Sequence, residues 1–166
     1  MRILVLNADY PRFLSWLYRR QPGLGNAGYA AQMAARNASL FGVADFYSRN
    51  FSALGHAAAE IHVNNAWLQA AWAREHGMAV KVAGPSTSGT TSLPAWLQRA
   101  VTPLKPMLRP LARKVGLSPS LDAQAEKILL AQIEHFKPDV VLNQDTFYVD
   151  PSLMRRIKGI GNPILI

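Results

Sequence analysis

The chain has 166 residues, of which 49% are hydrophobic and 17% are charged. This length fits one globular domain with a sizeable core, and the composition excludes a disordered chain. No apolar run approaches the ~20 residues that a membrane-spanning helix needs, and the first apolar stretch is too short for a signal peptide. Because there is no cysteine, disulfides, thiolate catalysis and cysteine-ligated metals are excluded. These features fit a cytoplasmic protein.

The net charge of +8 is concentrated in two parts of the chain. Residues 1–50 carry six arginines against two aspartates, and residues 76–121 carry six basic residues and no acid. A basic excess favours anionic partners such as phosphates, lipid headgroups or nucleic acid. Nucleic acid is the least favoured of these, because the sequence has no aromatic and basic motif of a known nucleic-acid-binding module.

The first half of the chain predicts alternating strands and helices. Residues 2–7 contain a continuous apolar run from Ile3 to Leu6, which is typical of a strand covered on both faces. The next stretch is polar, aromatic and rich in proline and glycine, so we expect an extended loop there. In chain order, the predicted strand, loop, two helices, strand and third helix occupy residues 2–7, 8–26, 27–40, 44–54, 59–63 and 65–77.

The second half begins with a change of composition. Residues 78–83 form a candidate short strand, and residues 84–118 predict a basic insertion. Within this insertion, residues 94–116 combine four prolines with apolar and basic side chains, which indicates a broken amphipathic helix. The remaining pattern predicts a helix, a strand, a helix and a last strand at residues 118–136, 139–143, 150–158 and 163–166.

Apolar strands that alternate with helices predict an α/β fold. We expect a Rossmann-like parallel sheet with helices on both faces, formed by residues 1–166 as a single domain. The chain finishes on the apolar pattern of residues 163–166, whereas a buried parallel strand normally feeds another crossover. We therefore expect this chain to be the front part of a longer protein.

Polar side chains follow three of the expected strands. They are Asn7, Asp9 and Tyr10 after the first, Asn64 and Asn65 after the second, and Asn143, Gln144 and Asp145 after the third. Ligands of open parallel sheets bind outside the carboxyl ends of the strands, so these side chains predict a crevice for a polyhydroxylated or nucleotide ligand. Helix capping and turn formation are the alternative for the asparagines and aspartates. Gln144 is harder to explain in that way, because glutamine is not a capping residue.

A glycine-rich stretch, Gly23-Leu24-Gly25-Asn26-Ala27-Gly28, matches the dinucleotide pattern G-x-G-x-x-G. In that pattern the first glycine directly follows its strand, but here the strand ends near Asn7, which argues against NAD. A glycine-rich loop before a helix N-terminus still suits a phosphate or a sugar hydroxyl, so Gly25 and Asn26 are candidate binding residues. The alternative is that the glycines only shape a loop.

A set of short segments in residues 1–77 and 120–166 carries a resemblance to a known family. They are MRILVLN at 1–7, YPRFL at 10–14, GN at 25–26, ADFYS at 44–48, LGH at 54–56, IHVNN at 61–65, WAREHG at 72–77, QIE at 132–134, FKPDVV at 136–141 and NQD at 143–145. Together they resemble the N-terminal half of GT-B glycosyltransferases, specifically the CgeB-like family of the spore-maturation type.

The resemblance implies two Rossmann-like domains with the active site in the cleft between them. The N-terminal domain of such enzymes usually contacts the acceptor, and the C-terminal domain holds the nucleotide-sugar. The donor-binding domain would be missing here, so this chain alone should be inactive. We expect no metal, and no cofactor beyond the nucleotide-sugar, which is itself a substrate.

We therefore expect the acceptor-side domain of a nucleotide-sugar-dependent glycosyltransferase that acts on a glycan, lipid-linked or protein acceptor. Transfer requires deprotonation of an acceptor hydroxyl, for which Asp145 and Asp9 are the catalytic candidates. The expected substrate-binding residues are Asn7, Tyr10, Gly25, Asn26, Asn64, Asn65, Asn143 and Gln144.

Two other hypotheses remain open. The basic and apolar residues of 94–116 are compatible with peripheral contact to an anionic membrane, or with packing of an insertion on its own domain. The chain as a whole is also compatible with a non-enzymatic Rossmann-like module that binds a nucleotide or a carbohydrate without turning it over.

Overall fold

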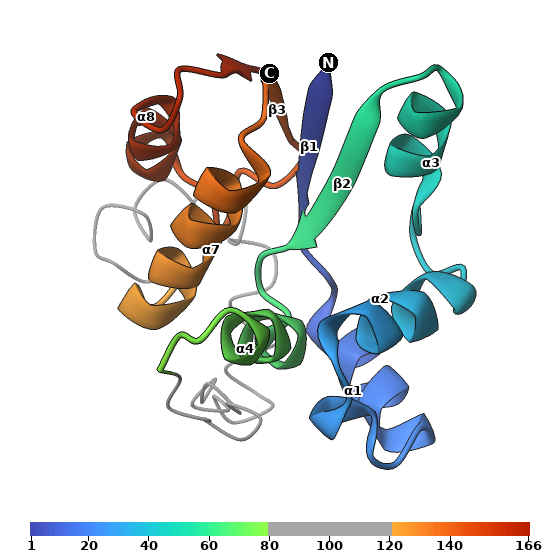
Figure 1. The fold of residues 1–166 in the computed structure, drawn as a ribbon. Coiled ribbons are helices and arrows are strands. Elements are labelled where there is room, and N and C mark those ends of the chain that lie inside the picture. The colour runs from blue at the N-terminus through green and yellow to red at the C-terminus, as the bar shows by residue number, and fades with distance from the viewer. Residues whose placement is uncertain (80–120) are drawn as a thin grey trace, which may run out of the picture. The chain divides into compact units, whose positions relative to one another are not determined.

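The computed structural model describes residues 1–79 and 121–166 of the chain. The strands are β1 (Arg2–Asn7), β2 (Ala57–His62), β3 (Val140–Asn143) and β4 (Ile164–Leu165) (Figure 1). The helices are α1 (Pro11–Arg20), the short 3-10 helix η1 (Leu24–Asn26), α2 (Tyr29–Ala38), α3 (Phe46–Ala53), α4 (Ala66–Glu75), α7 (Ala123–Phe136) and α8 (Pro151–Lys158). The predicted insertion, with its amphipathic stretch 94–116, and most of the candidate strand 78–83 lie outside the described residues.

The four strands form one parallel sheet in the order β2-β1-β3-β4, which confirms the predicted α/β fold. The chain moves from β1 to β2 in one direction and then returns past β1 to β3 and β4. The direction therefore reverses between β1 and β3. In sheets of this type, the crevice at the carboxyl ends of the two strands flanking such a reversal is where ligands bind.

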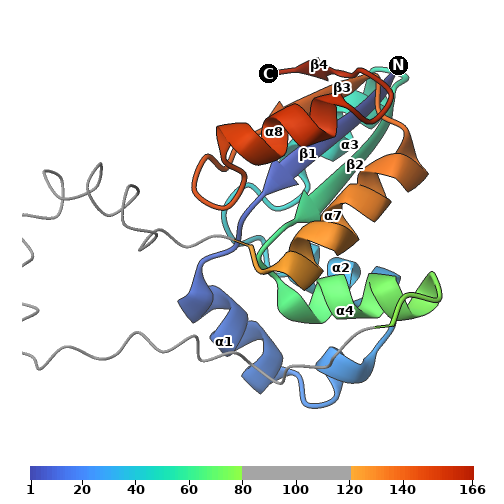
Figure 2. The same ribbon diagram turned by 90° about the vertical axis from the view of Figure 1, so that its left-hand side faces the viewer.

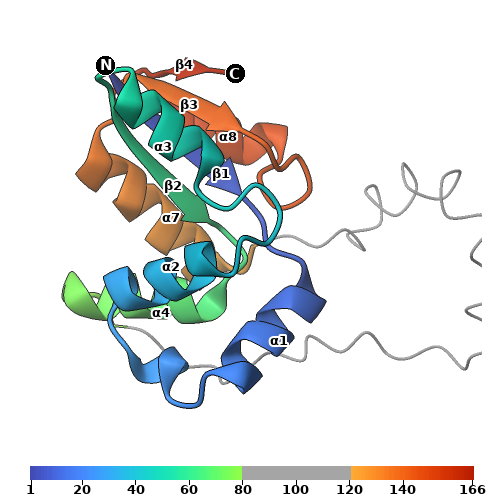
Figure 3. The same cartoon turned by 90° about the vertical axis from the view of Figure 1, so that its right-hand side faces the viewer.

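Alternating side chains of β1 and β2 face opposite sides of the sheet. Leu4 and Leu6 belong to the main core cluster, together with Ile61 of β2 and buried residues of α7 and α8. Figure 2 shows α7 and α8 in front of the sheet, and Figure 3, from the opposite side, shows α3 in front of it. Helices thus cover both faces, as expected for a Rossmann-like layer. The second face carries Asn7 and, on β2, polar side chains that form the site described below.

The predicted loop 8–26 is wrong in its first half, because α1 lies at Pro11–Arg20. Pro11 occupies the first turn of this helix, where its missing N–H has no helical partner to lose. Phe13, Leu14 and Leu17 have the spacing of one helical face, and all three are buried. Proline at the start of a helix was misread as a sign of a loop, and the glycines mark only the turn that follows.

Element ends differ from the predictions by a few residues. Helix α7 begins at Ala123 and not at Ser118, because the Asp122 side chain accepts a hydrogen bond from the main-chain N–H of Ala125 at 2.7 Å. Its last turn closes on Lys137 in the left-handed conformation. Asp150 caps α8 in the same way, as expected. In the part of the chain that is described, no helix has the length and apolar character to cross a membrane.

Candidate functional site

The loops that follow β1 and β2 are joined by a reciprocal pair of hydrogen bonds. The main-chain N–H of Asp9 donates to Asn64 Oδ1 at 2.8 Å, and Asn64 Nδ2 donates to the main-chain oxygen of Asp9 at 2.6 Å. The next residue, Asn65, accepts the N–H of Leu68 at 3.2 Å and so caps α4. The structure brings the two strand ends together as expected. It also engages the side-chain oxygens of both asparagines in contacts within the protein.

A cluster of buried charges lies directly behind these loops. Oδ1 of Asp9 accepts hydrogen bonds from Arg36 Nη2 at 2.8 Å and Arg36 Nε at 3.2 Å. Nδ1 of His62 lies 3.3 Å from the same oxygen, and Nε2 lies 3.7 Å from Glu60 Oε2. Asn7 Nδ2 donates to Glu60 Oε2 at 3.3 Å. All five residues are buried.

The cluster determines what Asp9 can do. Burial raises the pKa of the Asp9 carboxyl, but the nearby imidazole of His62 and the hydrogen-bonded guanidinium of Arg36 outweigh burial and hold the pKa below its usual value. A carboxylate of low pKa behind a closed surface is a weak proton acceptor. The geometry therefore favours a positioning role for Asp9, because this residue fixes the chain immediately before Tyr10.

The end of β3 adjoins the end of β1. The main-chain N–H of Gln144 donates to the main-chain oxygen of Leu6 at 2.9 Å, and the Gln144 side chain is exposed. Asn143 accepts the N–H of Asp145 at 3.1 Å. Oδ1 of Asp145 in turn accepts the N–H groups of the two residues at 147 and 148, each at 2.7 Å. Within residues 1–79 and 121–166, no hydrogen bond engages Oδ2 of Asp145, which lies just after the end of β3.

Gly25 and Asn26 lie in η1, which packs against α4. A Cβ added at Gly25 would lie 2.7 Å from Cδ1 of Trp67, so the glycine allows close contact with this indole. The N-terminus of α2 already binds a carboxylate of the protein, because Glu75 Oε1 accepts the N–H of Tyr29 at 2.7 Å. Gly25 and the N-terminus of α2 are therefore engaged in contacts among η1, α2 and α4, whereas Asn26 is exposed.

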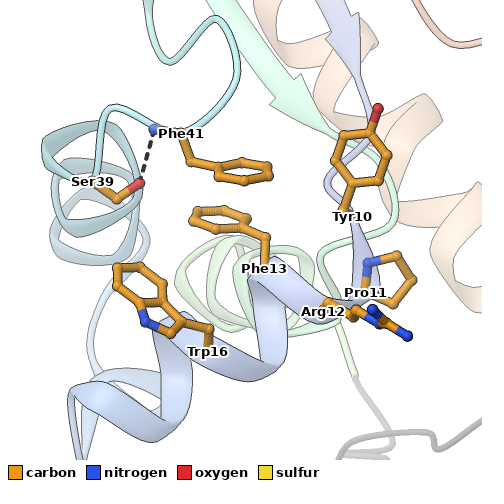
Figure 4. A pocket seen from close by; sticks show the side chains of 7 residues that line it. All are labelled: Tyr10, Pro11, Arg12, Phe13, Trp16, Ser39 and Phe41. Atoms are coloured by element: carbon orange, nitrogen blue, oxygen red, sulfur yellow. Dashed lines mark hydrogen bonds between the residues drawn. The ribbon is translucent and has the colours of Figure 1, made fainter.

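An aromatic pocket opens where the chain leaves β1 (Figure 4). It has a volume of about 980 Å³ and is lined by Tyr10, Pro11, Arg12, Phe13, Trp16, Ser39 and Phe41. The rings of Phe13 and Phe41 are stacked, with centroids 4.2 Å apart and planes inclined by 6°. Tyr10 meets Phe41 edge-on at 5.9 Å, and Trp16 lies 6.0 Å from Phe13. We refer to these seven residues as the aromatic pocket.

Tyr10 is the single predicted site residue that lines the aromatic pocket. The others were missed because residues 8–26 were expected to be an extended loop. One signal was present, since Tyr10, Phe13 and Trp16 recur at every third position, which places aromatic rings along one side of a helix. No pattern in the sequence predicts that Phe41, in the loop after α2, stacks on Phe13.

The aromatic pocket rests on the buried charge cluster. The hydroxyl of Ser39 donates to the main-chain oxygen of Arg36 at 2.6 Å and accepts the N–H of Phe41 at 3.3 Å. The guanidinium of Arg36 lies 5.9 Å from the centroid of the Phe13 ring. Arg36 thus holds Asp9 on one side and supports the two stacked rings on the other. This double contact ties the shape of the pocket to the end of β1.

The described residues contain no group of three or more histidine, aspartate and glutamate side chains arranged to hold a metal ion. Comparison of the chain with protein-family models, with curated proteins and with solved structures finds no match in any of the three.

Proposed function

We propose that the chain is the acceptor-side domain of a nucleotide-sugar-dependent glycosyltransferase with a GT-B architecture. The observation that carries this proposal is the position of the aromatic pocket. It opens at the carboxyl end of β1, the strand that flanks the reversal of the parallel sheet. Enzymes and binding proteins with such sheets hold their ligands at this place. Apolar rings in a concave site are also typical of small-molecule pockets.

The proposal assigns different roles to the two aspartates. Asp145 is the candidate general base, because its Oδ1 is held by two main-chain N–H groups while Oδ2 has no partner among the described residues. The main-chain N–H of its neighbour Gln144 donates a hydrogen bond to Leu6 of β1. The carboxylate therefore lies beside the strand that leads to the aromatic pocket. Asp9 orients the segment that carries Tyr10. The nucleotide-sugar and its leaving diphosphate are assigned to a second domain, outside these residues.

The test uses the full-length gene product with a panel of nucleotide-sugars and acceptors. Sugar transfer that needs both substrates is the expected result. Asp145→Asn should lower kcat by about 100-fold or more, which is the usual contribution of a general base. Asp45→Asn, on a partly exposed aspartate whose ion pair with Arg49 is long at 3.8 Å, is the matched control and should retain full activity. Unchanged turnover in Asp145→Asn would remove this residue from the mechanism, and absence of turnover with every donor would reject the transferase.

The second candidate is a non-enzymatic module that binds a nucleotide or a carbohydrate. It is favoured by the same rings, because Trp16 and Tyr10 are 44% and 70% exposed and can stack on a base or a sugar without any chemistry. Calorimetric binding by the full-length gene product, without consumption of any nucleotide-sugar, would favour this module over the enzyme.

A further inference from the structure

The aromatic pocket offers few polar groups for its size. Besides Arg12, its polar side-chain atoms are the hydroxyls of Tyr10 and Ser39 and the indole N–H of Trp16. The Ser39 hydroxyl is already engaged, since it donates to the oxygen of Arg36 and accepts the N–H of Phe41. The ring of Phe41, which stacks on the buried Phe13, offers apolar surface only. Most of a ligand inside this pocket would therefore meet carbon.

A pocket lined mostly by apolar groups binds some classes of acceptor better than others. A free sugar carries a hydroxyl on most of its carbons, and each hydroxyl that leaves water without a new partner is unfavourable. An apolar chain or ring gains from the same surface, because it is removed from water. The pocket volume of about 980 Å³ is large enough for a group of this kind. The chemistry of the lining thus favours a ligand whose buried part is apolar.

Arg12 adds a requirement for negative charge. Its side chain is exposed, and it makes no hydrogen bond or ion pair with any residue of the described ranges. Helix α1 carries two more arginines, Arg19 and Arg20, and no acid, so no carboxylate on this helix competes for the guanidinium. A guanidinium binds phosphate and carboxylate through paired, charge-assisted hydrogen bonds.

From these contacts we infer that the acceptor is an anionic amphiphile. Its apolar group lies on the exposed rings of Trp16 and Phe41, and its phosphate or carboxylate is bound by Arg12. This inference rests on the proposed function, since it names the acceptor class of that same pocket. It also states what should not bind well, namely a free neutral sugar.

The test is isothermal titration calorimetry of the full chain with matched probes, all below their micelle concentrations. Octyl phosphate and octanoate carry the chain and the anion, octyl β-glucoside carries the chain with a neutral sugar, and inorganic phosphate and glucose lack the chain. We expect octyl phosphate to bind at least about tenfold more tightly than octyl β-glucoside, as a hydrogen-bonded charge would produce. Inorganic phosphate and glucose should bind weakly or not at all. The ratio of octanoate to octyl phosphate separates a carboxylate preference from a phosphate preference.

Variants of exposed residues assign the binding to this pocket. Arg12→Gln should bring the affinity for octyl phosphate down to that for octyl β-glucoside, and Trp16→Ala should weaken both. Arg19→Gln, on the same helix but outside the pocket lining, and Leu54→Ala, 72% exposed on another element, are the matched controls and should change neither affinity. Circular dichroism of each variant verifies the fold.

Equal affinity for the charged and neutral octyl probes, or an unchanged preference in Arg12→Gln, would overturn the inference. The outcome is separable from that of the proposed function. If the full-length gene product transfers sugar to free neutral glycans and octyl phosphate does not bind, the acceptor class is wrong and the transferase stands. If octyl phosphate binds as expected and no nucleotide-sugar is consumed, the transferase is wrong and the pocket remains an anionic-amphiphile site.

Discussion

Arg36 of α2 donates two hydrogen bonds to a single oxygen of Asp9, at 2.8 and 3.2 Å, and the two side chains are 4% and 1% exposed. The pair connects a helix to the residue that directly precedes Tyr10. Arg36 also donates to the main-chain oxygen of Ala44 at 3.0 Å, which fixes the loop that carries Phe41. One buried guanidinium thus holds both sides of the aromatic pocket.

Loss of this guanidinium should be strongly destabilising. Arg36→Met removes the main partner of a carboxylate that remains buried, and such changes lower the free energy of unfolding by about 3–5 kcal/mol. Urea unfolding followed by circular dichroism measures the loss. Arg49→Met is the control, because Arg49 and Asp45 are 66% and 36% exposed, and it should cost about 1 kcal/mol or less. Equal effects of the two variants would contradict the role given to Arg36.

The same carboxylate should give the protein a defined sensitivity to acid. The pKa of Asp9 in the folded state lies below its ordinary value of 3.8, so its contribution to stability is present above that value. That contribution is lost as the pH falls below 3.8 through the folded pKa. The difference in unfolding free energy between the wild type and Asp9→Asn should therefore shrink as the pH falls below 3.8. A difference that grows in acid would show the opposite sign of the shift.

Two neighbouring glycines should respond differently to a methyl group. A Cβ at Gly25 would lie 2.7 Å from Trp67, whose ring is held by a stack on Tyr18 with centroids 4.1 Å apart. A Cβ at Gly28 would meet the end of the flexible Glu75 side chain at 2.8 Å. Gly25→Ala should destabilise by about 1–3 kcal/mol and Gly28→Ala by less. Thermal unfolding compares them, and a neutral Gly25→Ala would remove the packing role assigned to this glycine.

Asn65, one of the predicted site residues, has a structural role as the N-cap of α4. Asn65 accepts the N–H of Leu68, and the Tyr18 hydroxyl lies 3.0 Å from the same oxygen. Asn65→Ala should lower the free energy of unfolding by about 1–2 kcal/mol, whereas Asn65→Ser should retain part of the cap. Chemical unfolding separates the two variants. If alanine is tolerated as well as serine, the asparagine is free for a ligand and the capping assignment is wrong.

The layered fold was accessible from the sequence because its signals are local. The strand at residues 2–7 carries a continuous apolar run from Ile3 to Leu6, and Asp150 before Pro151 marks the start of α8. The loops that carry Asp9 and Asn64 lie together because β1 and β2 are parallel neighbours, so their carboxyl ends meet at the same edge of the sheet. Helix α1 was missed because proline was given more weight than the spacing of Phe13, Leu14 and Leu17.

The interior of the site could not be predicted in the same way. Arg36 pairs with a residue that is 27 positions away, and on its own helix it has the pattern of an ordinary solvent-exposed arginine. Glu60 and His62 alternate with apolar residues in β2, which predicts that they face away from the core. They are buried because α3 covers that second face of the sheet. Contacts of this kind depend on how distant elements pack, and one sequence carries no local sign of them.

The most direct test of the account is to map ligand contact on the full chain by amide NMR during titration with octyl phosphate. The account predicts saturable shifts in residues 10–16 and 39–41, around the aromatic pocket, and their loss in Trp16→Ala. Shifts confined to other parts of the chain, or saturable binding that Trp16→Ala leaves intact, would contradict it.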